Sequence, residues 1–115
     1  MTLASESSMS HLLERLLGLV WPARAIARHV HHASEGGGQP LVCVAGHGWY
    51  QEWGRPARFL SPGDVVSVPA GAKHWHGAAR RSWSQHVAQS VPGKGAHVEW
   101  LEPVPDEEYD ALVER

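Results

Sequence analysis

Short apolar segments alternate with turn residues along most of the chain from residue 39 onward. "PLVCVAG" at 40–46 is a wholly apolar run, and "VVSVP" at 65–69 follows the turn sequence "SPGD" at 61–64. Glycine and proline interrupt helices but suit the tight turns between strands. Short apolar segments at close, even spacing therefore predict an all-β domain, built as a sandwich or a barrel.

The rest of the chain adds four strands and two helices to this expectation. Strands are expected over 49–54, 57–60, 83–89 and 97–102. Leucines at helical spacing predict an N-terminal helix over 12–20, capped by Ser8 or Ser10 and ended by Pro22. Acids in the first turn of "PDEEYDALVER" predict a short C-terminal helix. We expect residues 33–38 to form a flexible turn.

Length and charge limit the number of domains and the kinds of partner. A chain of 115 residues forms one domain. We divide it into an N-terminal segment, 1–28, partly helical or disordered, and a barrel domain, 29–115. The net charge of -2, without a basic stripe, argues against nucleic acid. No apolar run is long enough to span a membrane, and the N-terminus lacks the pattern of a signal peptide. We therefore expect a cytoplasmic protein in which the single cysteine, Cys43, is a buried, inert thiol.

Histidine is the residue type that points to chemistry, with nine in the chain. Three groups stand out: "HVHH" at 29–32, "HWH" at 74–76, and His86. On a strand, His29 and His31 face the same way, so both could bind one metal ion. A pair of this kind taken alone is more often surface histidine. We expect His47 and His97 to be such exposed residues.

The spacing of these histidines resembles the two-part signature of the cupins. The second part, G-x5-P-x-G-x2-H, matches in full at Gly63, Pro69, Gly71 and His74. The first part, an H-x-H followed by Glu or Gln and a glycine, matches at His29, His31, Gln39 and Gly46, with a wide gap before Gln39. "HVHHASEGGGQPLVCVAGHGWYQEWG", "HWHGAA", "SQHVA" and "VEWLEPVPDEEY" resemble one subgroup of small single-domain cupins. That subgroup includes manganese-dependent hydroxynitrile lyase-like cupins and carboxymuconolactone decarboxylase-associated cupins.

The resemblance implies a small cupin β-barrel, or jelly roll, with a metal site inside it. It implies one divalent transition metal per chain, manganese or iron first and nickel or zinc as alternatives, held by His29, His31, Gln39 and His74. His76 and His86 would then lie near the metal as candidate catalytic residues. Neutral imidazoles and an amide would leave the metal a strong Lewis acid, and a histidine beside it could move a proton.

One segment departs from the family pattern. A strand rich in β-forming residues, with a glycine and usually an aromatic residue, ordinarily precedes the H-x-H. This chain has "PARAIARH" there, with Ala23 and Arg28 at those places, and it reads as a helix. A slip of one residue would also put His32 in the place of His31.

Three functions fit this site. The first is a lyase that cleaves a C–C bond in a small organic molecule, as in a cyanohydrin or a decarboxylation. The alternatives are an iron-dependent dioxygenase and a non-catalytic cupin that binds or senses a small molecule. We also expect a homodimer, because the exposed edge strands of a small barrel can pair with a second copy. Trp75 or Trp83 is expected to line the cavity.

Overall fold

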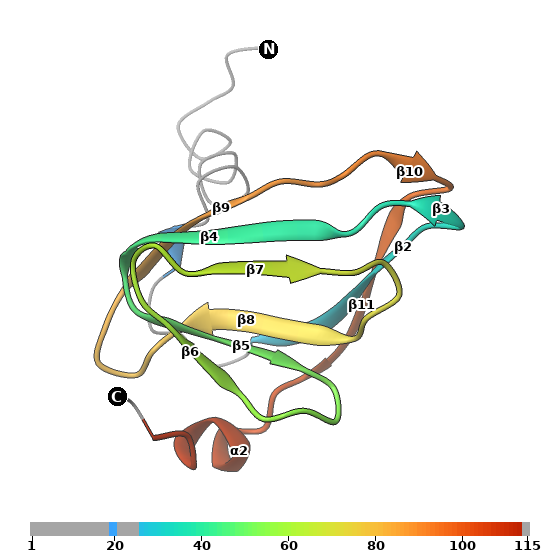
Figure 1. The fold of residues 1–115 in the computed structure, drawn as a ribbon. Coiled ribbons are helices and arrows are strands. Elements are labelled where there is room, and N and C mark those ends of the chain that lie inside the picture. Colours follow the sequence, from blue (N-terminus) through green and yellow to red (C-terminus); the bar gives the residue numbers. More distant parts are fainter. Residues whose placement is uncertain (1–18, 21–25, 114–115) are drawn as a thin grey trace, which may run out of the picture.

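The structure, a computed structural model, describes residues 19–20 and 26–113. Nearly all of its regular structure is β-strand (Figure 1). The elements run in the order β1 (Leu19–Val20), β2 (Ala27–His32), β3 (Glu35–Gly36), β4 (Gln39–Gly46), β5 (Gly48–Glu52), β6 (Arg58–Leu60), β7 (Val65–Val68), β8 (His74–Ala78), β9 (Ser84–Ala88), β10 (Gly93–Lys94), β11 (His97–Pro103) and the helix α2 (Asp106–Asp110).

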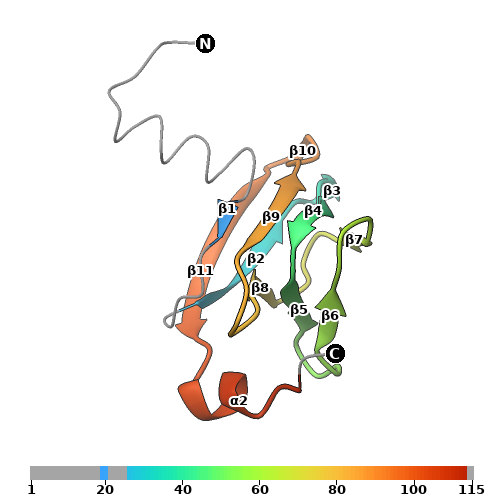
Figure 2. The same ribbon diagram turned by 90° about the vertical axis from the view of Figure 1, so that its left-hand side faces the viewer.

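Two antiparallel sheets form the barrel (Figures 1 and 2). One has four strands in the order β1-β9-β4-β7, and the other has five in the order β11-β2-β8-β5-β6. The short strands β3 and β10 form a separate two-stranded pair. The chain thus has the all-β barrel fold that the sequence predicts, with the apolar strands of one sheet facing those of the other.

The apolar core between the sheets comes from alternate residues of the central strands. Leu41 and Cys43 of β4 pack with Val66 and Val68 of β7, and Leu60 of β6 joins them from the other sheet. Their neighbours along each strand face outward, as the two-residue period of a strand requires. Cys43 is buried and free, as expected.

A second apolar layer covers the outer face of the five-stranded sheet. Trp49 and Trp75 pack there against Val104 and Tyr109 from the C-terminal segment. The hydroxyl of Tyr109 donates a 2.7 Å hydrogen bond to the carbonyl of Ala78. The α2 helix is therefore part of the packing of the barrel, and the predicted C-terminal helix is confirmed.

The junction between β2 and β8 is unusually narrow. The two strands share a single register pair, His29 opposite His74. By contrast, β5 pairs with β8 at five consecutive positions, from Gly48 opposite Ala78 to Glu52 opposite His74. The five-stranded sheet therefore has one register pair where it passes from β8 to β2, and the N–H of Gly71, just before β8, donates a 2.9 Å hydrogen bond to the carbonyl of His31.

The six predicted strands over 40–102 are confirmed, but three other expectations were wrong. Val20 lies in β1, which pairs with Ser84 and Gln85 of β9, so the predicted helix does not reach residue 20. Ala27 and Arg28 are strand, not helix, because both lie in β2, where Ala27 pairs with Pro103 of β11. The expected turn at 33–38 contains β3.

The rest of the predicted N-terminal helix lies outside the described residues, and the boundary at residue 28 stays a prediction. Within the described part of the chain, no helix is long and apolar enough to cross a membrane.

Candidate metal centre

The histidines of β2 and β8 gather because the two strands meet at these residues. His29 and His74 lie opposite each other, and His31 lies two residues along β2 on the same face. The rings of His29 and His74 are 4.2 Å apart between centroids, and the other two pairs are 5.2 and 5.5 Å apart. One nitrogen from each ring falls within 4.8 Å of the others. The structure therefore brings together three of the four predicted ligands.

Two backbone carbonyls orient these rings. The Nδ1 of His74 lies 2.9 Å from the carbonyl of Ala72, and that of His29 lies 3.3 Å from the carbonyl of Ala27. A carbonyl oxygen only accepts hydrogen bonds, so each Nδ1–H is the donor and each Nε2 carries the lone pair. A hydrogen-bonded second nitrogen is the usual companion of a metal-binding histidine.

Several buried polar side-chain atoms at this cluster have no hydrogen-bond partner among the described residues. They include the Nε2 atoms of His31 and His74 and the Oε1 of Gln39. An unsatisfied buried polar atom costs about 1–3 kcal/mol. The amide of Gln39 is close enough to favour the charged form of His31, so it belongs to the same group. One nitrogen from each of the three histidines converges, and the amide oxygen of Gln39 has no other partner among the described residues. This set of donors fits a divalent cation.

Burial keeps these imidazoles neutral. Burial first, and then the charge of His74, lower the pKa of His29 to about 4. Burial also lowers the pKa values of His31 and His74, although the backbone bond to Ala72 partly opposes this for His74. Neutral rings are the form that binds metal ions, so the site is set for a cation at neutral pH.

His76 and His86 lie directly beside the cluster. His76 faces the same side of β8 as His74, and its ring is 5.4 Å from that of His29. His86 of β9 meets His76 edge to face at 4.9 Å. Burial, followed by the charge of His86, lowers the pKa of His76 well below its usual range, and burial lowers that of His86. The Nδ1 of His76 is buried without a partner among the described residues.

His32 does not take the place of His31. His31 pairs with Val98 and faces the cluster, whereas His32 points away from it and bonds to Glu99 at 2.8 Å. The register of β2 therefore turns His29 and His31 towards the cluster, without the possible slip by one residue.

Trp75 does not line the histidine cluster, which corrects one expectation. It lies between His74 and His76 on β8, so its side chain faces the opposite side of the sheet, where Nε1–H donates to Gln51 at 2.9 Å. Trp83 is 42% exposed. Strand alternation alone could have excluded Trp75.

Two residues near the cluster were missed by the sequence analysis. Trp100 of β11 lies opposite His29, and the two rings are 4.7 Å apart. Tyr50 of β5 lies opposite His76, and its ring is 5.9 Å from that of His74. The position of each residue near the cluster depends on how its strand is paired, and local sequence does not determine that pairing.

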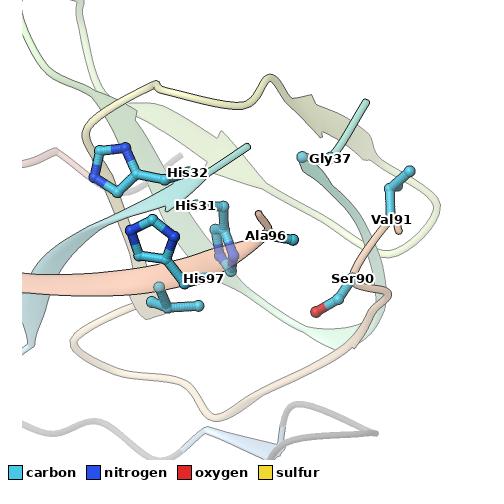
Figure 3. Close-up of a pocket in the computed structure, with 9 residues that line it drawn as sticks. His31, His32, Gly37, Ser90, Val91, Ala96 and His97 are labelled. Atoms are coloured by element: carbon cyan, nitrogen blue, oxygen red, sulfur yellow. The ribbon is translucent and has the colours of Figure 1, made fainter. Parts of the chain in front are cut away.

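A small pocket lies next to His31, between β2, β11 and the segments at Gly37 and Ser90 (Figure 3). Its volume is about 130 Å³, and its lining includes His31 together with His32 and His97. Such a volume accommodates only a few non-hydrogen atoms or waters.

Known proteins resemble the chain in sequence and in structure. An (R)-mandelonitrile lyase of Granulicella tundricola is 41% identical over 88 residues, which cover 76% of this chain and 64% of the relative. The crystal structure of a cupin-like protein from Thermotoga maritima matches with a TM-score of 0.62 and 39% identity, over 79% of this chain and 65% of that one. The chain thus spans just under two thirds of either protein. No protein-family model matches the chain.

Proposed function

Since this chain is a small cupin, we propose that it is a metal-dependent enzyme that cleaves a C–C bond in a small organic molecule. The convergence of one nitrogen each from His29, His31 and His74 within 4.8 Å is the observation that carries the proposal. The name of the mandelonitrile lyase relative supports the choice of lyase chemistry. A cyanohydrin is accordingly the first substrate class to test.

We assign the metal to the three histidines and to the Oε1 of Gln39. This donor set suits several divalent ions, with manganese or iron as the first choice and nickel or zinc as alternatives. None of the four donors is charged, so the positive charge of a bound ion stays largely uncompensated. When bound, the ion supplies Lewis acidity that polarises a substrate oxygen and lowers the pKa of a hydroxyl group.

His76 is the proposed general base. Because burial holds its pKa low, its ring is neutral at physiological pH and can accept a proton at Nδ1. In a cyanohydrin, the hydroxyl proton passes to His76 as the carbonyl forms and the bond to the nitrile carbon breaks. The electron pair of that bond leaves with cyanide, which takes the proton back. His86, in edge contact with His76, is positioned to hold the imidazolium in place or to relay the proton.

The decisive experiment measures metal content and turnover on the same samples. Wild type, His74→Ala and His76→Ala are purified, reconstituted with Mn²⁺ or Fe²⁺, and assayed with mandelonitrile under anaerobic conditions. We expect about one ion per chain in wild type, its loss in His74→Ala, and its retention without turnover in His76→Ala. His47→Ala, which alters an exposed histidine away from the cluster, is the matched control.

Other outcomes favour the alternative functions. Oxygen consumption that depends on Fe²⁺ and substrate would replace the lyase with a dioxygenase. Thermal stabilisation by a small molecule without turnover would favour a binding or sensing protein. Wild type without metal after reconstitution would end the metal-enzyme proposal. The small-molecule substrate and the homodimer stay proposals, and sedimentation of the full chain tests the dimer.

A further inference from the structure

A second pair of histidines lies on the other face of β2, outside the interior cluster. His32 and His97 are directly opposite each other on β2 and β11. His97 is exposed, and the side chain of His32 is 39% exposed. Figure 3 shows the two rings side by side on these neighbouring strands. Neither residue contributes to the proposed catalytic site.

Hydrogen bonds fix which nitrogen of each ring is free. The Nδ1 of His97 lies 2.8 Å from the carbonyl of Gly95, two residues back along the chain. His29 and His74 each contact the carbonyl two residues back in the same way. Because a carbonyl only accepts, the Nδ1–H of His97 is the donor, and its Nε2 carries the lone pair.

Glu99 orients His32 in a corresponding way. The Nε2 of His32 lies 2.8 Å from a carboxylate oxygen of Glu99, so Nε2–H donates and Nδ1 keeps the lone pair. A carboxylate that accepts from the far nitrogen of a histidine raises the basicity of the nitrogen that binds a metal. Each ring of the pair thus has one nitrogen engaged and one available.

The two rings are arranged like one pair of the interior cluster. They are stacked with centroids 5.0 Å apart and planes 23° apart, and His31 and His74 are stacked at 5.5 Å and 23°. Both rings line the pocket of about 130 Å³, which leaves room for water molecules as further ligands.

We propose that the Nδ1 of His32 and the Nε2 of His97 form a second, surface site for a divalent transition metal. Imidazole ligands suit Cu²⁺, Ni²⁺ and Zn²⁺, and water completes the coordination. The site is independent of the proposed catalytic function, because it shares no ligand with the interior cluster.

Ni²⁺ binding by the full-length protein tests this proposal. Equilibrium dialysis at pH 8, followed by elemental analysis, is carried out on wild type, His97→Ala, His74→Ala and the control His47→Ala. We expect His97→Ala to bind one Ni²⁺ fewer per chain than His47→Ala. Because His47→Ala also lacks one exposed histidine, the difference between the two variants excludes Ni²⁺ bound elsewhere on the surface.

The variants separate the two sites. Loss of one ion in His97→Ala but none in His74→Ala would support the surface site and contradict the interior one. Equal Ni²⁺ binding by His97→Ala and His47→Ala would overturn the surface site. Glu99→Ala is a second check that leaves both ligands in place. We expect it to weaken the surface site by about 10- to 100-fold, and unchanged affinity would refute the role assigned to Glu99.

Discussion

Acid should destabilise the metal-free protein well above the pH at which its carboxylates titrate. In the unfolded chain, His29 gains a proton as the pH falls through about 6.5, whereas in the folded protein it stays neutral until about pH 4. Between these values the unfolded state binds more protons, so stability falls as the pH falls. The contribution of the neutral His29 to the free energy of unfolding is complete above pH 6.5 and is lost as the pH falls towards 4.

The magnitude follows from the size of the pKa change. A decrease from 6.5 to about 4 corresponds to about 3 kcal/mol, at roughly 1.4 kcal/mol per unit. Because His29 is only 5% exposed, solvent screening reduces this little. About 2 kcal/mol of the loss falls between pH 7.5 and pH 5. Burial lowers the pKa values of the neighbouring His31 and His74 too, so they act in the same direction.

Urea unfolding in the presence of EDTA at pH 7.5 and pH 5 measures this loss. In His29→Asn the group no longer titrates, while the asparagine amide can replace the donor to Ala27. We expect the loss of unfolding free energy to be about 2 kcal/mol smaller in this variant than in wild type. His47→Asn should behave like wild type. Equal losses in His29→Asn and wild type would refute the assignment of a strongly depressed pKa to His29.

Three further predictions follow from the contacts described above. Gln39→Glu should retain metal in elemental analysis yet lower kcat, because a carboxylate compensates the charge of the ion; an unchanged kcat would contradict this. His76→Ala should lose at least 100-fold in kcat, in keeping with a general base whose contribution is about 10²–10⁴, and a smaller loss would remove His76 from that role. Gly46→Ala should lower the free energy of unfolding by more than about 3 kcal/mol, because a Cβ there would lie 1.9 Å from the carbonyl oxygen of Trp83 at a φ of +68°. Gly54→Ala, at a φ of +80° with nothing within 4 Å, should cost only about 1–2 kcal/mol, and equal costs in urea unfolding would show that the contact is relieved.

Local sequence patterns were sufficient for six of the strands but not for β8, His74–Ala78, nor for the convergence of the histidines. The apolar run containing Leu41 and the turn at Gly63 could be placed because each is determined by nearby residues. The convergence of His31 with His74 was predictable only through the resemblance to cupins, because the pairing of β2 with β8 joins distant parts of the chain. Tyr50 and Trp100 were missed for the same reason, since each approaches the cluster from another strand.

The errors in the sequence analysis arose where long-range pairing outweighs local preference. Ala27 and Arg28 belong to a segment with helical character, yet β2 is held between β8 and β11 and takes them into the sheet. Val20 was assigned to a helix because its apolar spacing fits one, but it pairs with Ser84 at the edge of the other sheet. Neither constraint is visible within a window of local sequence.

The single register pair between β2 and β8 makes the proposed metal a mechanical element as well as a chemical one. His29 and His74 form that pair, so an ion held by both would clamp the only register pair described between β2 and β8. Closing the intervening stretch of chain with an ion restricts it much as a covalent cross-link would. Amide hydrogen exchange near His29 of β2 and His74 of β8 should therefore slow on metal loading. Exchange should change least where β5 pairs with the other end of β8, at Gly48 opposite Ala78.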